Sequence, residues 1–293
     1  MKLHFCGVRG STPAPGLDFV RYGGNTSCVA ISRDGEDPTL LLDAGTGLSR
    51  VSRVLGGRPF RGTILLGHLH WDHTHGLPFF NAGDQDGAVV RMLLPAQAGG
   101  TAEDLLAGAM SPPHIPIRPG ELRGSWSFDH IQEGEHEIEG FTVHAREIPH
   151  KGGRTFGYRV GDEGHTIAYL SDHWPGSMGD GPAGFGPYHE AALALAKDAD
   201  VLIHDAQYTQ EEYPGRRTFG HSTIDYALGL GAAAGVGRVV LFHHDPRRTD
   251  DELDLIASSL TPCPVDVTIA REEQTIRLAS GSSVVESDDY PLP

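Results

Sequence analysis

Histidines and an aspartate crowd one short stretch of the chain, directly after an apolar run. The stretch ILLGHLHWDHTHG, residues 64–76, places His68, His70, Asp72 and His73 in the order HLHWDH. Side chains alternate along a strand, so His68 and His70 point the same way at the strand end. Two imidazoles side by side suit one divalent ion, and Asp72 and His73 in the following turn can reach a neighbouring position. The spacing therefore predicts ligands for two metal ions.

An ordinary polar turn is the alternative explanation of this stretch, because single histidines often occupy strand ends. Four ionisable side chains packed together without a metal would, however, be costly to bury. We therefore favour metal ligation. His75 lies beside these residues, and we expect it to support the ligands or to have no part in the site.

The net charge limits the partners that the chain can bind. The 293 residues carry 23 Lys and Arg against 39 Asp and Glu, a formal charge of −16. This charge repels polyanions, so sequence-independent binding of DNA or RNA requires a local basic patch. Arg216/Arg217 and Arg247/Arg248 could form one, although paired arginines at a turn are more often solvated surface. A small substrate is therefore favoured, and no long nucleic acid is expected.

Short β-rich runs bounded by Gly, Pro, Asp or Asn predict enough strands for two sheets. They cover residues 27–32, 39–43, 63–67, 88–95, 141–145, 156–160, 165–171, 200–205, 238–242 and 265–269. Helices are predicted at residues 102–110, 188–199, 222–236 and 249–260. The last two begin with Ser222 and Thr249, each followed three residues later by an acidic residue, as in a capping box.

The chain is expected to form one domain over residues 1–280, followed by an acidic tail at residues 281–293. Residues 83–125 are rich in Gly and Pro and are predicted to leave the sheet as an insertion or lid. The N-terminus has no apolar stretch of signal-peptide length, and nowhere do about 18 apolar residues run together. Cys6, Cys28 and Cys263 are too scattered for a disulfide scaffold. We therefore expect a cytoplasmic protein with no membrane partner.

The motif HLHWDH resembles the metal-binding motif of the metallo-β-lactamase superfamily, an α+β fold built as a four-layer αββα sandwich. The family pattern continues with a histidine, a bridging aspartate and a last histidine, each at a strand end. His150 in REIPHKGG, Asp172 in IAYLSDH and His243 in VVLFHHDP fit in that order. The match spans residues 3 to about 260, which makes a chance agreement of all these motifs improbable.

The resemblance also implies how the ligands are shared between two ions. The first ion would be held by His68, His70 and His150, and the second by Asp72, His73 and His243, with Asp172 bridging them. His244 is an alternative to His243, because neighbours in a strand face opposite sides. We choose His243, and His173, beside Asp172, is not counted among the ligands.

Further motifs resemble the phosphodiesterase branch that includes RNase Z, the PhnP-type cyclic phosphodiesterases and the anti-Pycsar cyclic-nucleotide nucleases. They are GVRGSTPAPG, YGGNTSC, LLDAGTG, GLPFF, LIHDAQYT and GHST. In that branch the histidine of GHST lies near the leaving group, so His221 would be the general acid and Asp205 would orient it. Ser222 as a helix cap is compatible with this role. Asp43 of LLDAGTG would support the ligand histidines by hydrogen bonds.

The activity implied by this resemblance is phosphodiester hydrolysis with two divalent ions. A metal-bound hydroxide would attack phosphorus, Asp72 would accept the water proton, and His221 would protonate the leaving oxygen. Zn²⁺ is the first expectation for the metal, with Mn²⁺ or Fe²⁺ as alternatives.

The substrate is expected to be a small phosphodiester, above all a cyclic nucleotide. RNase Z carries a tRNA-gripping arm between the counterparts of His150 and Asp172, and the interval 151–171 is too short for one. The alternatives are an RNase Z-like endoribonuclease and a thioester- or persulfide-acting metallo-hydrolase of the same fold. A homodimer is expected, because relatives in this branch are commonly dimers.

Overall fold

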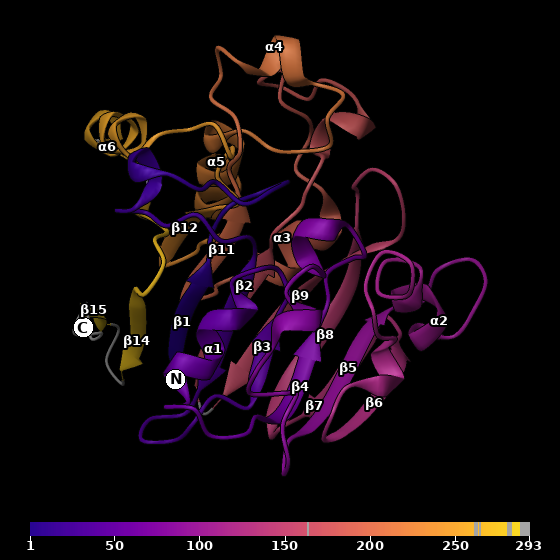
Figure 1. Ribbon diagram of the computed structural model, residues 1–293. Coiled ribbons are helices and arrows are strands. Elements are labelled where there is room, and N and C mark those ends of the chain that lie inside the picture. The colour runs from indigo at the N-terminus through magenta and orange to yellow at the C-terminus, as the bar shows by residue number, and fades with distance from the viewer. Residues whose placement is uncertain (163, 261–262, 264, 280–282, 288–293) are drawn as a thin grey trace. The chain divides into compact units, whose positions relative to one another are not determined.

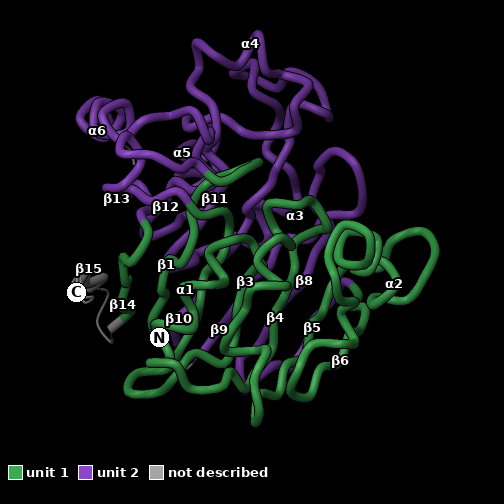
Figure 2. Tube along the Cα trace, in the orientation of Figure 1, with its two compact units in different colours: residues 1–13, 25–132, 272–293 green, residues 14–24, 133–271 purple. Residues whose placement is uncertain are grey.

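The computed structural model describes residues 1–293 except 163, 261–262, 264, 280–282 and 288–293. The chain divides into two compact units (Figure 2). Unit 1 comprises residues 1–13, 25–132 and 272–293, and unit 2 comprises residues 14–24 and 133–271. Each unit contains one mixed β-sheet with its own helices (Figure 1).

The sheet of unit 1 has eight strands in the order β15-β14-β1-β2-β3-β4-β5-β6. Its strands β3, β4, β5 and β6 pair in parallel, and the remaining pairs are antiparallel. The bounds are β1 (Lys2–Gly7), β2 (Cys28–Ser32), β3 (Leu40–Leu42), β4 (Arg61–Leu65), β5 (Val89–Pro95), β6 (Ser125–Ile131), β14 (Thr275–Ala279) and β15 (Ser283–Ser287).

Buried apolar runs form the centre of this sheet. Every residue of β2 and β3 is buried, as expected for central strands that are covered on both faces. Helix α1 (Leu48–Val54) contacts β1, and α2 (Ala102–Ala107) contacts β6. Their apolar side chains join those of the strands in one core cluster. Short 3₁₀ turns, η2 (Trp71–His73), η3 (Leu77–Phe79) and η4 (Pro119–Glu121), complete the unit.

The sheet of unit 2 has seven strands in the order β13-β12-β11-β10-β9-β8-β7. Strands β10, β11, β12 and β13 pair in parallel, and β7 to β10 form antiparallel hairpins. The bounds are β7 (Gly134–Ile138), β8 (Phe141–Ile148), β9 (Thr155–Asp162), β10 (His165–Leu170), β11 (Val201–Asp205), β12 (Arg238–Phe242) and β13 (Asp266–Ile269).

Helices cover this second sheet and share a core cluster with it. Helix α3 contacts β8, β9 and β10, α5 contacts β11 and β12, and α6 contacts β13. The bounds are α3 (Glu190–Ala196), α4 (Tyr213–Arg216), α5 (Ile224–Ala234) and α6 (Asp250–Ser259), with the 3₁₀ turns η1 (Leu17–Phe19) and η5 (Pro175–Met178). Parallel strands joined through helices bring several strand ends to the same edge of the sheet.

Each strand and helix predicted from the sequence is present, with ends shifted by a few residues. The unpredicted elements are β1, β6, β7, β14, β15, α1 and α4. Strands β6 and β7 lie at sheet edges and alternate exposed with partly buried residues, so their apolar pattern is weak. Phe156 and Tyr158 are buried in β9 and therefore belong to the core.

The two expected helix caps have different outcomes. Thr249 caps α6 in a capping box with Glu252, as predicted. The prediction for α5 is wrong by one residue, because Thr223 accepts the hydrogen bond from the backbone N–H of Tyr226. The Ser222 hydroxyl instead donates to the carbonyl of His173 at 2.6 Å.

The stretch 83–125 does not lie wholly outside the sheet, because Val89–Pro95 form β5. Its remaining residues contain α2 and η4, and their role as an insertion or lid stays a prediction. The predicted tail 281–293 lies partly outside the described residues, but Ser283–Ser287 pair with β14 as β15. Within the described parts of the chain, no helix combines the length and apolar character needed to cross a membrane.

Candidate metal and phosphodiester site

Two parallel strands of unit 1 end beside each other at the start of the histidine motif. Asp43 directly follows β3, and the chain leaves β4 through Gly67 to His68. The backbone N–H of Gly67 donates to Asp43 Oδ1 at 2.7 Å. Asp43 has a φ of 63°, a left-handed conformation that Asp and Asn tolerate better than most residues. The carboxylate thus sits at the base of the motif, as the sequence predicted.

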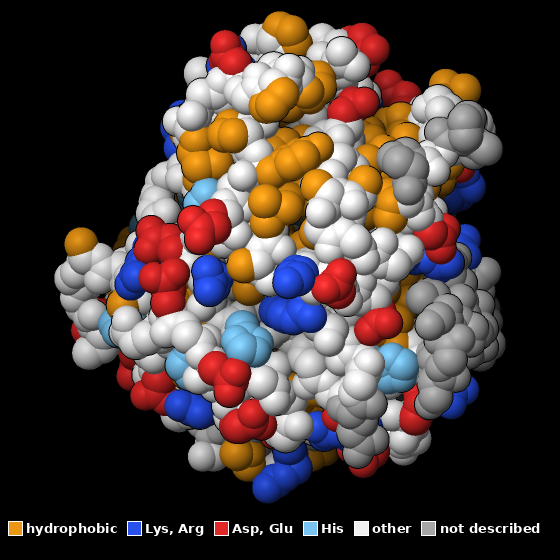
Figure 3. Space-filling model, turned by 180° about the vertical axis from the view of Figure 1, so that it is seen from behind, with side chains coloured by type: hydrophobic (Ala, Val, Ile, Leu, Met, Phe, Trp, Pro, Cys, Tyr) orange, Lys and Arg blue, Asp and Glu red, His pale blue; other side chains and the backbone are white. Residues whose placement is uncertain are grey.

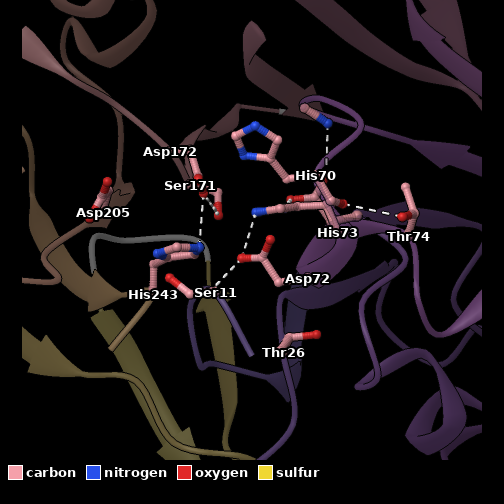
Figure 4. Close-up of polar contacts among 12 residues, drawn as sticks. Ser11, Thr26, His70, Asp72, His73, Thr74, Ser171, Asp172, Asp205 and His243 are labelled. Carbon is pink, nitrogen blue, oxygen red and sulfur yellow. Dashed lines mark hydrogen bonds and ion pairs between the residues drawn. The ribbon is translucent and has the colours of Figure 1, made fainter. Parts of the chain in front are cut away.

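The four motif residues cluster within unit 1. The ring of His68 lies 4.3 Å from the rings of His70 and His73, measured between centroids. His73 Nε2 lies 3.2 Å from Asp72 Oδ2, and that oxygen accepts the backbone N–H of Ser11 at 2.7 Å (Figure 4). His68, Asp72 and His73 are buried.

Asp43 orients one ligand candidate. Its Oδ2 lies 2.7 Å from His73 Nδ1, in a contact where both side chains are fully buried. A carboxylate beside Nδ1 favours the tautomer that carries the proton on Nδ1. The lone pair of Nε2 is then available to a metal ion or a proton. This carboxylate–histidine pair is typical of metal sites, and it agrees with the supporting role predicted for Asp43.

Three neighbouring parallel strands of unit 2 end in the other candidate residues. Asp172 lies two residues after β10, Asp205 ends β11, and His243 directly follows β12. Asp172 faces two imidazoles, with Oδ2 at 3.3 Å from His150 Nε2 and Oδ1 at 3.0 Å from His243 Nε2. Figure 4 shows the second of these contacts. A carboxylate with a nitrogen on each oxygen has the geometry of a bridging ligand.

The outer nitrogens of these two imidazoles are also held. His150 Nδ1 lies 2.7 Å from the carbonyl oxygen of Gly220, and His243 Nδ1 lies 3.1 Å from Gln207 Oε1. Gly220 has a φ of 100°, and a Cβ there would lie 3.2 Å from His150 Cε1. Glycine therefore allows the close approach of this carbonyl. In both histidines the Nδ1 contact leaves Nε2 for a ligand, so the donor set of each unit fits a divalent ion.

His221 is paired with Asp205, as the sequence predicted. Its Nδ1 lies 3.0 Å from Asp205 Oδ2. The same carboxylate accepts backbone N–H groups from Gln207, His173 and Ser222 at 3.1, 3.2 and 3.3 Å. Four donors hold this carboxylate, which positions the imidazole with Nε2 away from Asp205. Such a pair can deliver a proton to a leaving oxygen.

His244 and His173, which are not among the predicted metal ligands, contact other residues. His244 Nε2 contacts the carbonyl oxygen of Ala270 at 2.8 Å, so His243 is the one that faces Asp172. His173 Nδ1 lies 3.0 Å from His204 Nε2, and His204 Nδ1 lies 2.6 Å from the carbonyl of Asp205. Burial lowers the pKa of both His173 and His204, so they are neutral at pH 7. His204 lies inside a strand run, where no local pattern indicates a polar role.

Three further contacts were missed by sequence reasoning. Gln207, Gly220 and the backbone of Ser11 each hold a candidate side chain in place, but their motifs do not reveal which atom meets which residue. In YGGNTSC, the backbone N–H and the side-chain amide of Asn25 both donate to Glu272.

The arginine pairs do not form a free basic patch. Arg216 and Arg247 contact Asp245, Arg217 contacts Asp180, and Arg248 contacts Glu212. Burial raises the pKa of Asp245 and Glu212, but the hydrogen bonds from Arg247 to Asp245 and from Arg248 to Glu212 outweigh it and leave both pKa values below their usual range. On the face shown in Figure 3, basic and acidic side chains are interspersed. Each of these arginines therefore faces a carboxylate.

Comparisons with known proteins agree with the motifs. Residues 39–244 match the family model described as a beta-lactamase superfamily domain. Ribonuclease Z of Gemmatimonas aurantiaca is 25% identical over 322 aligned positions, which cover 95% of this chain and 96% of the relative.

Two solved structures share the fold. The metallo-beta-lactamase fold protein YhfI of Bacillus subtilis has a TM-score of 0.68 and 18% identity. The alignment covers 94% of this chain and 98% of the YhfI chain. Human tRNase Z, short form, has a TM-score of 0.65 and 22% identity, covering 95% and 100%. The family match and these structures confirm the expected α+β metallo-β-lactamase fold, and the relatives named Ribonuclease Z agree with the expected metal-dependent phosphodiesterase.

The expectation about nucleic-acid partners is wrong. The acidic charge and the short interval 151–171 led to the prediction that no long nucleic acid is a partner, yet relatives matched over almost their whole length are named Ribonuclease Z. Net charge and the length of one loop are therefore not sufficient to exclude RNA. The chain belongs to the β-lactamase superfamily.

Proposed function

We propose that this phosphodiesterase cleaves ribonucleotide phosphodiesters, with structured RNA as its first substrate class. One observation carries the proposal: neighbouring strand ends of unit 2 combine a carboxylate facing two imidazoles, Asp172, with the His221–Asp205 pair. The first suits two divalent ions, and the second suits proton transfer to a leaving oxygen. The relatives named Ribonuclease Z support RNA as the substrate.

The proposed ligand set is the one that the resemblance implies. His68, His70 and His150 would hold one ion, and Asp72, His73 and His243 a second, with Asp172 bridging them. The fixed Nδ1 contacts of His73, His150 and His243 support this set. Zn²⁺ is the first candidate metal, and Mn²⁺ or Fe²⁺ also suit imidazole and carboxylate ligands. Such ions would supply a water of lowered pKa and neutralise charge on the phosphate.

The residues of the chain would then control proton movement. Asp72, oriented by the Ser11 N–H, would accept the proton of the attacking water. The bond between phosphorus and the leaving ribose oxygen breaks, and His221 Nε2 protonates that oxygen. Asp205 keeps the imidazole in place and stabilises its charged form before the transfer.

A cyclic nucleotide is the second candidate substrate, and two observations favour it. The interval between His150 and Asp172 is occupied by the β9–β10 hairpin, and the arginine pairs each face carboxylates. Both features are compatible with a small substrate that needs few phosphate contacts. A cytoplasmic homodimer stays a prediction.

A substrate panel tests the proposal. Metal-loaded protein is incubated with a structured RNA that carries a 3′ extension, with 3′,5′- and 2′,3′-cyclic nucleotides, and with a bis-aryl phosphodiester. We expect endonucleolytic cleavage of the RNA, lost in Asp172→Asn. Turnover of cyclic nucleotides alone would favour the second candidate.

Hydrolysis of no diester would contradict the proposed function and direct attention to thioester or persulfide substrates. The exposed substitution Asp225→Asn removes the same charge from unit 2 and is the matched control. The rate of RNA cleavage should also fall as the salt concentration is raised, if phosphate contacts contribute to RNA binding.

A further inference from the structure

Unit 1 contains a cavity beside the histidine motif that the proposed chemistry does not use. Its volume is about 500 Å³, within the range of small-molecule sites. One side consists of η2, η3 and their connection, and the other of α2 and the segment after it. The principal lining residues are Trp71, His75, Phe79, Leu105, Met110 and Ile115.

Two aromatic side chains are exposed at this cavity. Trp71 is 66% exposed and Phe79 is 64% exposed, although the nearby Phe80 is fully buried. Aromatic rings that stay in water contribute no burial free energy to the fold. Exposed aromatic side chains at a cavity therefore indicate a binding surface. The Trp71 ring stacks on His75, with centroids 5.2 Å apart and planes inclined by 22°. This contact supports one face of the indole.

The cavity lining is uncharged apart from histidine. The residues that line it include His75 and His114, and none is Asp, Glu, Lys or Arg. A phosphate would find no arginine or lysine there. A planar, uncharged ring with polar edges would find apolar walls, two aromatic faces and the hydroxyls of Thr46 and Thr74.

The cavity and the candidate ligands share one wall, the segment 69–75. Trp71 stands between His70 and Asp72 in sequence, and within η2 it is exposed while Asp72 and His73 are buried. A substrate whose phosphate lies at these ligands could therefore extend an adjacent ring around the same segment. We propose that this cavity binds the nucleobase next to the scissile phosphodiester, with Trp71 as the stacking platform and Phe79 as a second aromatic contact on the same side of the cavity.

This inference rests on the proposed phosphodiesterase function, and a kinetic comparison tests it. An oligoribonucleotide substrate is compared with one that is abasic at the residue next to the cleaved bond. Stacking on an aromatic side chain is worth a roughly tenfold or larger change in affinity. Trp71→Ala should therefore raise KM for the normal substrate roughly tenfold and remove the preference over the abasic one. Trp71→Phe should restore part of that preference.

Phe79→Ala provides a second test, because Phe79 is farther along the chain from the ligands. It should raise KM in the same selective way while kcat and bound metal stay within about twofold of wild type. Leu255→Ala, an exposed apolar change in α6, is the control and should leave the preference intact. A KM ratio unchanged in both aromatic variants would overturn the inference while the phosphodiesterase function stood.

A binding measurement separates the two proposals. Adenosine is titrated into metal-free protein, and quenching of tryptophan fluorescence is followed in wild type and in Phe79→Ala. Saturable quenching that weakens in the variant supports a nucleobase site even if no diester is cut, an outcome that would overturn the proposed function alone. Absence of binding in wild type, or a shift from dimer to monomer in both aromatic variants, would overturn the inference.

Discussion

The Nδ1 atom of His221 lies 3.0 Å from Oδ2 of Asp205, in a contact that joins GHST to the end of β11. The two residues are 16 positions apart in sequence. Asp205 is held by three backbone N–H groups as well, so its orientation does not depend on the imidazole. This arrangement positions His221 independently of any metal and leads to the first prediction.

Substitution of His221 should impair catalysis without removing metal. In His221→Asn the amide nitrogen can still donate to Asp205, but no group titrates. We expect kcat to fall about 10²–10⁴-fold for a ribose leaving group and far less for nitrophenolate, which leaves without protonation. Steady-state rates on both substrates, with metal content by mass spectrometry, check this. Equal losses on both leaving groups would exclude an acid role.

Asp205→Asn should act in the same direction through His221. The alkaline limb of the kcat profile against pH should shift, because a general acid must be protonated to act. A change in protein stability alone would leave that profile unmoved and would assign Asp205 a structural role only.

Asp172 should control metal binding itself. Its oxygens lie 3.3 and 3.0 Å from His150 and His243, and an amide supplies one oxygen where the carboxylate supplies two. Asp172→Asn should lower bound metal and reduce kcat about 10³-fold or more, because a metal ion contributes several kcal/mol to charge stabilisation. Full metal occupancy in the variant, measured against Asp225→Asn, would argue against the bridging assignment.

Asp43 should tune metal affinity through His73. Asparagine tolerates the left-handed backbone at this position, so Asp43→Asn removes the charge with little change of conformation. Loss of such an outer partner typically lowers metal affinity 10–100-fold. Competition with a chelator gives the affinity, and the surface substitution Asp37→Asn is the matched control. An unchanged affinity would show that His73 is not a ligand or does not need this partner.

His4 should make unit 1 sensitive to acid. Burial, assisted by Lys2, lowers the pKa of His4 to about 4, whereas an unfolded histidine titrates near 6.5. The unfolded state therefore binds the proton first, and the stability associated with neutral His4 is complete above pH 6.5 and is lost as pH falls towards 4. The loss should approach roughly 2–3 kcal/mol.

Denaturant unfolding at pH 7 and pH 4.5 measures this effect. The fall in the free energy of unfolding should be smaller in His4→Gln, which keeps a hydrogen-bonding side chain and does not titrate. Identical pH dependence in the two proteins would contradict the assignment.

The sequence by itself determined the residue types of the candidate site and their order along the chain. HLHWDH could be found because it follows an apolar strand run, which is a local pattern. Asp172 and His243 were identified by the resemblance to the family pattern of ligands at strand ends. The same local pattern predicted the central strands. It failed at the edge strands β6 and β7, where one face meets water, and it placed the α5 cap at Ser222 instead of Thr223.

Only the tertiary structure decided which partner each side chain meets. Gln207 at His243, Gly220 at His150 and Asp43 at His73 depend on which strands and turns become neighbours, and such long-range pairing leaves no local periodicity. Tertiary structure likewise decided that Phe156 is buried and Trp71 is exposed at a cavity. Burial is a property of packing between distant segments, and residue type alone does not determine it.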